Sequence, residues 1–393
     1  MKYKFILKYY CLLSFVIFLQ ITNGQNAPGN SQNLIIENRF HSGKIVKNYP
    51  SFPERSLSWI YEFNLSKQTT GENSWHVNYG YPRIGLSVFC GSLGNTDILG
   101  NVTGLVPNMN LHLIKGKNWQ TRMTLGCGFA YFQKPYDSVN NAENILIGSK
   151  ITNYSFATLS FNRKINQRLV FTSGISAMHC SNGHYQVPNL GMNIIAVSMG
   201  LKYFPRKIPV FEPEPKSMKP ENDLKLNFRT SLGVHEFART LGPVGGPKYS
   251  VYCGSVFLSK RFGWISNVHA GFTGKYYTNF YEFITENNFY EDKHHLKSTV
   301  ITFFLAHEFM IDRFSLLTQG GIDLHNPFFK DYDKLENIKM TTFRFLETYI
   351  STRLGFQYYL LPINNRFNIY TGIYIKANFG QADFIAANIG FSI

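Results

Sequence analysis

The chain has 393 residues, a formal net charge of +15, 35 Phe and 24 Tyr, yet only 16% of its residues are charged. Soluble domains average about 25% charged residues, so this composition argues against an ordinary soluble domain. It favours a transmembrane β-barrel, whose lipid-facing residues are apolar and whose two interfaces carry aromatic girdles. A soluble β-sandwich or solenoid is the alternative that composition leaves open.

Residues 1–24 have the layout of a secretory signal peptide. Lys2, Lys4 and Lys8 precede an apolar run that ends near Ile21, and Thr22-Asn23-Gly24 then supplies a small, polar cleavage region. The apolar run is shorter than the ~20 residues that a spanning helix needs, and a retained anchor is the alternative. Export excludes nucleic acid from the expected partners, whereas the basic excess suits the anionic headgroups of a membrane.

The four cysteines outside the leader predict neither a metal site nor a cofactor. They are Cys90, Cys127, Cys180 and Cys253. Their spacing is wide, and they form no CxxC pair. Export permits disulfides, but nothing in the spacing requires one.

Residues 25–79 are predicted to be a polar N-terminal extension with one short strand-like piece at 56–67, and residues 80–393 to be the barrel. From Gly80 onward, alternating segments bounded by turn signals recur. They predict strands at 80–93, 100–115, 118–133, 148–163, 168–181, 192–205, 224–240, 247–260, 263–277, 296–311, 313–326, 345–359, 366–377 and 381–393. We therefore expect an all-β, antiparallel transmembrane barrel of about 14 strands, within a range of about 12 to 16.

The connections alternate between short and long, as periplasmic turns and outer loops do in such barrels. Short joints fall near Gly116, Lys164, Arg261, Asp312 and Pro362. Longer ones fall at 134–147, 182–191, 278–295 and 327–342. The exception, Pro205 to Asp223, is long, Pro-rich and basic, and it predicts a seam between residues 80–205 and 224–393. The last strand, ending Gly390-Phe391-Ser392-Ile393, is of the kind that the barrel-assembly machinery recognises.

Strand alternation brings three polar residues to one surface. The face of strand 168–181 that carries His179 and Ser181 is apolar below His179, which predicts that it faces lipid. In strand 192–205, Asn193 begins the apolar face in the same way. We therefore expect His179, Ser181 and Asn193 on the outward surface of one hairpin. The alternative is that they lie in the headgroup zone, where polar side chains cost little.

A serine beside a histidine predicts nucleophilic ester chemistry. His179 would take the hydroxyl proton of Ser181 as general base. Backbone N–H groups of Asn182-Gly183-His184 and the Asn182 amide would stabilise an oxyanion. The substrate would be an ester that reaches the site laterally from the membrane.

The segments His179-Cys180-Ser181-Asn182-Gly183 and Pro188-Asn189-Leu190-Gly191-Met192-Asn193 resemble the signature of the PagL-type lipid A 3-O-deacylases, and more broadly that of the acyloxyacyl hydrolases. Further similar pieces are Gly80-Tyr81-Pro82, Gly85, Asn144 and Ile147-Gly148-Ser149, so that the resemblance covers roughly Trp75 to Phe204. The resemblance implies a metal-free Ser-His-acid esterase of the bacterial outer membrane. It also implies lipid A, the anchor of outer-leaflet lipopolysaccharide, as substrate, Ser181 as nucleophile and His179 as base.

Two departures from the family pattern bear on these roles. The family's catalytic Glu is replaced by Asn193, which can orient a histidine but cannot stabilise an imidazolium by charge. Alternation in strand 224–240 places Glu236 outward, and we expect it beside Asn193 on the neighbouring strand as a substitute acid; an interfacial Glu without a role is the alternative. The second departure is length, because the small deacylase has no counterpart of the C-terminal half.

Further substrate contacts are predicted from position. Asn182, Gly183 and Asn189 lie next to the proposed nucleophile, while Arg239 and Lys248 flank a Gly-rich loop and are suited to lipid A phosphates. Ordinary loop solvation is the alternative for the two cations. For the whole chain, the alternatives to a lipid A deacylase are a phospholipase and a non-enzymatic barrel, namely a channel, adhesin or structural protein.

Overall fold

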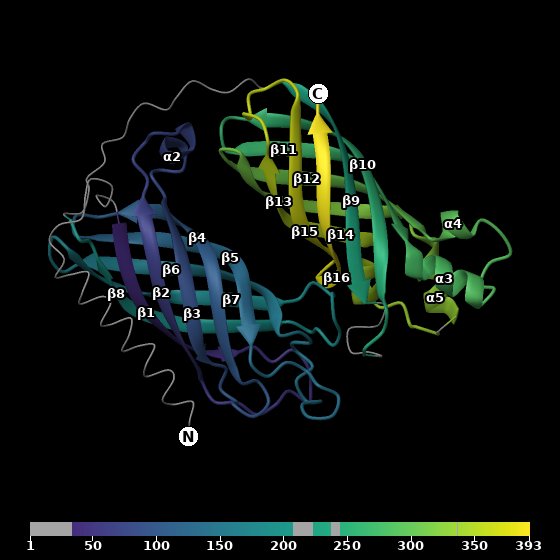
Figure 1. Cartoon of the computed structure of the whole chain (residues 1–393), viewed down its shortest axis with the longest axis horizontal. Coiled ribbons are helices and arrows are strands. Elements are labelled where there is room, and N and C mark those ends of the chain that lie inside the picture. The colour runs from purple at the N-terminus through teal and green to yellow at the C-terminus, as the bar shows by residue number, and fades with distance from the viewer. Residues whose placement is uncertain (1–33, 207–222, 237–243, 336) are drawn as a thin grey trace. The chain divides into compact units, whose positions relative to one another are not determined.

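The computed structural model describes residues 34–206, 223–236, 244–335 and 337–393. In this part of the chain, sixteen strands form two closed, eight-stranded antiparallel barrels, the first from β1 to β8 and the second from β9 to β16 (Figure 1). The two compact units of the chain follow these barrels, with the short segments Asn73–Asn78 and Gly183–Val187 grouped with the second. The predicted signal peptide lies outside the described residues.

The first barrel contains β1 (Leu34–Ile45), β2 (Ser58–Gln68), β3 (Arg83–Ser92), β4 (Asn101–Lys115), β5 (Trp119–Phe132), β6 (Ile151–Lys164), β7 (Leu169–Ser181) and β8 (Met192–Tyr203). A short helix, α2 (Ser74–Asn78), follows β2 in sequence. The barrel closes because β1 pairs with both β2 and β8, for example Ile36 with Tyr203. Every strand therefore has two neighbours, and no edge is left unpaired.

The second barrel contains β9 (Leu224–Glu236), β10 (Lys248–Phe262), β11 (Ser266–Tyr277), β12 (Thr299–Ile311), β13 (Phe314–His325), β14 (Ile350–Tyr359), β15 (Asn368–Asn378) and β16 (Gln381–Ser392). Its longer connections hold α3 (Thr278–Glu286), α4 (His294–Lys297), α5 (Pro327–Leu335) and α6 (Thr342–Tyr349). Closure is through β9, which pairs with β10 and β16. The strand predicted at 345–359 starts later than expected, because its first residues belong to α6.

The all-β, antiparallel prediction is confirmed, each predicted strand is present, and the total of sixteen strands lies within the expected range. The prediction of a single barrel is wrong, because the strands close into two. The predicted extension contains β1, and the piece at 56–67 is β2, a full member of the barrel. Strand β1 escaped prediction because its inward side chains include Glu37, Arg39 and His41, so it lacks the apolar alternation of its neighbours. The first barrel ends with β8 and the second begins with β9, one on each side of the predicted seam.

The strands of both barrels are apolar outside and largely polar inside. On β8, the outward Val197 and Met199 are each 62% exposed, while the inward Ser198 and Lys202 are buried. Strand β10 repeats the pattern, with exposed Val256 and Leu258 between buried serines. An apolar outer wall around a polar interior is the pattern of a transmembrane barrel. No helix among the described residues has the length and hydropathy to span a membrane.

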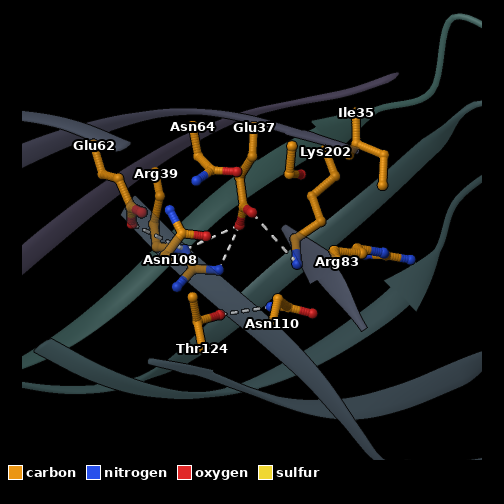
Figure 2. Close-up of a pocket in the computed structure, with 11 residues that line it drawn as sticks. Ile35, Glu37, Arg39, Glu62, Asn64, Arg83, Asn108, Asn110, Thr124 and Lys202 are labelled. Carbon is orange, nitrogen blue, oxygen red and sulfur yellow. Dashed lines mark hydrogen bonds and ion pairs between the residues drawn. The ribbon is translucent and has the colours of Figure 1, made fainter. Parts of the chain in front are cut away.

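Several buried charges inside the first barrel are paired with one another. Figure 2 shows Glu37 between Arg39 and Lys202; the Glu37 carboxylate is bonded to the Arg39 guanidinium and lies 3.4 Å from Nζ of Lys202. His41 bridges Glu62 and Ser176 at 3.0 and 3.1 Å. Because a buried charge without a partner is strongly destabilising, these pairs favour the pairing of β1 with its neighbours β2 and β8.

Candidate active site

His179 and Asn193 are direct cross-strand partners at the loop end of the β7–β8 hairpin. Both side chains point outward, as the alternation predicted. Nδ1 of His179 donates a hydrogen bond to Oδ1 of Asn193 over 2.8 Å. This bond places the ring proton on Nδ1, so Nε2 keeps its lone pair. An imidazole in this tautomer is ready to accept a proton from a hydroxyl.

Ser181 ends β7 two residues beyond His179, on the same outward face. It is only 7% exposed, unlike the outward residues before it. The Asn189 amide donates to Oγ of Ser181 over 2.9 Å, and Oδ1 of Asn189 accepts from the backbone N–H of Asn182 over 3.2 Å. Asn189 therefore ties the loop after β7 to the serine.

Backbone conformation at Gly191 keeps the loop close to the histidine. Its φ is +72°, in the region that favours glycine, and an added Cβ would lie 3.3 Å from Cε1 of His179. Asn182 is held on the other side of the serine, where its amide donates to Oγ of Ser149 over 3.2 Å. Gly183, the next residue in the chain, also has a positive φ, of 66°. These contacts hold the loop residues next to Ser181.

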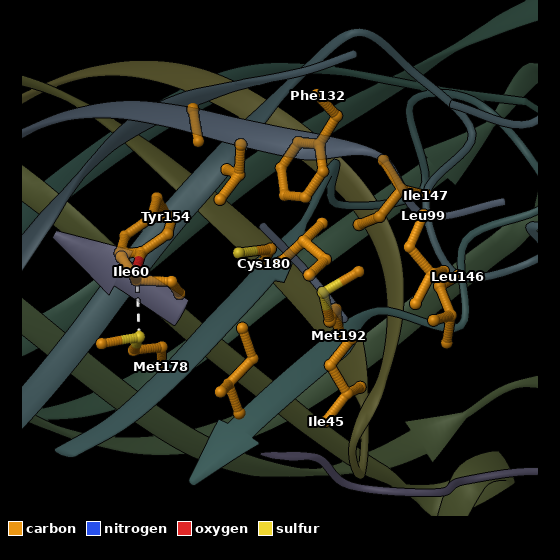
Figure 3. Close-up of a cluster of buried hydrophobic side chains, with 14 of the residues drawn as sticks. Ile45, Ile60, Leu99, Phe132, Leu146, Ile147, Tyr154, Met178, Cys180 and Met192 are labelled. Carbon is orange, nitrogen blue, oxygen red and sulfur yellow. Dashed lines mark hydrogen bonds between the residues drawn. The ribbon is translucent and has the colours of Figure 1, made fainter. Parts of the chain in front are cut away.

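An apolar cluster inside the barrel supports the strands that carry the site. The inward neighbours of the site residues, Met178, Cys180 and Met192, are buried in this cluster with Phe132 and Tyr154 (Figure 3). The Tyr154 hydroxyl donates to the sulfur of Met178 over 3.1 Å. Since interior packing resists shifts of the backbone, the cluster fixes the positions from which His179 and Ser181 project outward.

The expectation that Glu236 neighbours Asn193 is wrong. Strand β8 pairs with β7 and β1, whereas β9, which carries Glu236, pairs with β10 and β16 of the other barrel. The Glu236 carboxylate accepts from Nζ of Lys248 over 2.6 Å and from the backbone N–H of Gly246 over 2.9 Å. Glu236 is therefore not on a strand next to Asn193, as a substitute acid there would need to be, and Lys248 is bonded to Glu236. Arg239 lies outside the described residues.

Three polar residues that the sequence reasoning missed lie next to the site on the same outward wall. In the register of β6 and β7, Asn153 faces Ser181 and Ser155 faces His179. Cys127 on β5 faces Ser155 in turn. The outward position of two of them could have been predicted from the sequence. The alternation of strand 148–163 places Asn153 and Ser155 on the face that continues with Ala157 and Leu159. Within the described residues, no group of three or more His, Cys, Asp or Glu side chains is suited to hold a metal ion.

Fold and site together define a class of protein: a membrane-type β-barrel with a serine and a histidine at one end of its outer wall. Residues 58–202 match the family model of lipid A 3-O-deacylase (PagL), and residues 224–393 match that of the acyloxyacyl hydrolase C-terminal domain. The chain therefore carries a PagL-type domain followed by an acyloxyacyl hydrolase C-terminal domain, and these domains imply an ester hydrolase. The resemblance is confirmed, and the C-terminal half has a family model of its own.

Several solved structures are similar at low identity. The outer membrane enzyme PagL is 14% identical, and the match covers 42% of this chain and 97% of that chain with a TM-score of 0.30. CdiB from Acinetobacter baumannii is 8% identical over 92% of this chain and 60% of its own, with a TM-score of 0.18. The toluene transporter TodX of Pseudomonas putida is 8% identical over 93% of this chain and 90% of its own, with a TM-score of 0.16. No curated protein sequence matches the chain.

Proposed function

We propose that this chain is a serine esterase of the bacterial outer membrane that hydrolyses an acyl ester of lipid A. Ser181 is the nucleophile, His179 is the general base and Asn193 orients the imidazole. The observation that carries the proposal is the hydrogen bond between Nδ1 of His179 and Oδ1 of Asn193, which in the neutral imidazole puts the ring proton on Nδ1, with His179 on the same outward face as Ser181.

The reaction begins with attack of the Ser181 hydroxyl oxygen on the ester carbonyl. Residues two apart on one face of a strand have Cα atoms about 7 Å apart. The side chains of a histidine and a serine are together long enough to meet across this distance. His179 accepts the hydroxyl proton through Nε2 and returns it to the departing sugar hydroxyl. Water then attacks the acyl-serine with the same base, and the fatty acid leaves.

Negative charge develops on the ester carbonyl oxygen during the attack, and hydrogen-bond donors near Ser181 are needed to stabilise it. The Asn182 amide and the backbone N–H of Gly183 are the proposed donors, because both directly follow the nucleophile in the chain. The amide of Asn189 already donates to the serine oxygen, so its role is to hold the nucleophile. Donors fixed before the reaction stabilise the transition state without reorganisation.

The outward position of the site matches a substrate that stays in the membrane. The residues below His179 on the same face, Ala177 and Ile175, are exposed and apolar. An acyl chain lying against this wall keeps its contact with lipid while its ester reaches Ser181. The substrate therefore enters from the side, and the barrel interior takes no part.

The experiment is mass spectrometry of lipid A from cells that express the wild type, Ser181→Ala or Ser173→Ala. Ser173 is an outward serine on the same strand and serves as the matched control. We expect one acyl chain to be lost with the wild type and with Ser173→Ala, and none with Ser181→Ala. Unchanged lipid A in all three, with each protein folded in the outer membrane, would exclude lipid A deacylation. A panel of glycerophospholipids would then test for phospholipase activity.

A further inference from the structure

A small cavity lies in the interior of the first barrel, at the end opposite the proposed active site (Figure 2). Its wall includes Lys202 near the end of β8, whereas Asn193 of the active site lies at the start of that strand. The lining is mostly polar and contains three cationic side chains, those of Arg39, Arg83 and Lys202. The apolar cluster that supports the active site includes none of these residues, so the cavity is separate from that site.

Two carboxylates also line the cavity, and both are already bonded to neighbouring side chains. The Glu37 carboxylate is bonded to the Arg39 guanidinium and lies 3.4 Å from Nζ of Lys202. The Glu62 carboxylate is bonded to Nε2 of His41 at 3.0 Å and lies 3.9 Å from Nε of Arg39. These contacts pair two of the three cations of the cavity wall with carboxylates and leave the third for separate consideration.

Arg83, the third cation, is buried with few partners. The residue is 4% exposed, and its Nε donates to Oε1 of Gln68 over 2.9 Å. Its Cζ lies 5.3 Å from the centroid of the Phe204 ring. Within the part of the chain that the structure describes, Arg83 forms no ion pair, and its two terminal nitrogens bond to no acceptor. Arg83 therefore brings unused N–H donors and an unpaired positive charge to the cavity wall.

Arg122 shows how another buried arginine of the same barrel is satisfied without a carboxylate. It is 3% exposed, and its nitrogens donate to the side-chain and backbone oxygens of Asn110 and to Oε1 of Gln120. Arg83 is buried to nearly the same extent but has only one such acceptor among the described residues. Because buried polar groups are normally hydrogen-bonded, the comparison indicates that a bound species completes the contacts of Arg83.

The charge of the barrel interior favours an anion over water as this species. With histidine neutral, the strands of the first barrel bury four cations and two carboxylates, so two positive charges are in excess: Arg39, Arg83, Arg122 and Lys202 against Glu37 and Glu62. Water accepts hydrogen bonds but does not offset charge, and a buried charge is costly unless it is paired. The cavity has room for about one water molecule, a size that suits a monatomic ion and is too small for a phosphate group.

We infer that this cavity binds a small monovalent anion, chloride or bromide, between Arg83 and Lys202. Arg83 supplies its terminal N–H groups, and the Lys202 ammonium, whose contact with Glu37 is 3.4 Å, supplies a further donor. Arg83 is on β3 and Lys202 on β8, two strands that are not neighbours in the sheet, so the site forms only when the barrel closes. A ligand that binds only the folded state stabilises it. The inference does not depend on the proposed esterase activity.

The test is urea unfolding of the full-length protein in lipid vesicles, in sodium chloride, sodium bromide or sodium gluconate at about 0.15 M. Gluconate is too large for the cavity. The wild type is compared with Arg83→Gln and with Arg163→Gln, the matched control, which removes the same charge at an exposed position of β6. In chloride and bromide, relative to gluconate, we expect the unfolding constants of the wild type and the control to be about tenfold lower, as anion at about ten times Kd gives. The Arg83→Gln protein is expected to lack this difference.

An equal effect of chloride on the wild type and Arg83→Gln is a general salt effect and overturns the anion site. Should Arg83→Gln not fold, Arg83→Lys takes its place; it keeps the charge but loses the planar fork of donors, and the effect of chloride should be smaller than in the wild type. Anomalous diffraction from wild-type crystals soaked in sodium bromide gives an independent measurement. A bromide peak between Arg83 and Lys202 supports the site, and its absence there overturns it.

Discussion

His179 and Asn193 face each other across β7 and β8, and a 2.8 Å hydrogen bond joins Nδ1 of the imidazole to Oδ1 of the amide. Like a catalytic carboxylate, the amide fixes the orientation and the tautomer of the ring. Unlike a carboxylate, it carries no negative charge to stabilise the imidazolium that forms when His179 takes the proton of Ser181.

Substituting Asn193→Glu is therefore expected to increase kcat. A carboxylate at this position keeps the hydrogen bond and adds the missing charge; the reverse loss of charge in a Ser-His-Asp protease lowers kcat by about 10⁴. On an outward wall we expect a smaller gain, of about tenfold, measured as fatty acid released from lipid A vesicles. Asn193→Ala is the control and should lower kcat. If Asn193→Glu and Asn193→Ala lose activity equally, the site requires the amide itself.

Asn189 offers a test of how the nucleophile is held. Asn189→Asp keeps an acceptor for the Asn182 backbone N–H but loses the donor to the Ser181 oxygen. We expect kcat to fall by about 10²-fold, in keeping with the effect of misplacing a reacting group, while the loop keeps its structure. Asn189→Ala loses both bonds and should lower kcat at least as far. Wild-type kcat in Asn189→Asp would show that the donor bond has no catalytic role.

The apolar outer wall of the first barrel predicts that a charged side chain in place of Val197 strongly destabilises the folded protein. This residue is 62% exposed on the apolar face of β8. An arginine on the lipid face of a transmembrane barrel costs about 2–4 kcal/mol near the bilayer midplane, so Val197→Arg should destabilise the folded protein by about that amount in urea titrations with lipid vesicles. The matched control is Val139→Arg in a loop, where the residue is 86% exposed. Equal, small effects at both positions would argue against membrane insertion of this wall.

The paired charges inside the first barrel predict that Arg39 is important for stability. Its guanidinium is bonded to Glu37 and is 2% exposed. Arg39→Ala removes the hydrogen-bonded partner of the buried Glu37 carboxylate and leaves it with Lys202 alone. Breaking a buried pair costs about 3–5 kcal/mol, which urea unfolding in vesicles measures. Arg163→Ala at the exposed end of β6 is the control and should change the free energy of unfolding by less than about 0.5 kcal/mol. A small effect of Arg39→Ala would show that water or Lys202 compensates.

The sequence alone determined the outward face of the β7–β8 hairpin. Alternation places His179 and Asn193 on the apolar face, and consecutive strands of an antiparallel barrel pair with each other, so the meeting of these residues follows from local rules. The signature around Ser181 likewise lies within one continuous segment, so the order of its residues is enough to indicate the family.

Only the tertiary structure decided how the strands close. Alternation shows which face of a strand is apolar but not which distant strand it pairs with, so β8 could pair with β9 or return to β1. The return depends on β1, whose inward Glu37 is paired with Arg39 on the same strand and with Lys202, its direct partner on β8. With that closure, β9, which carries Glu236, does not pair with β8, which carries Asn193. Pairing between remote strands is settled by the packing of the whole barrel.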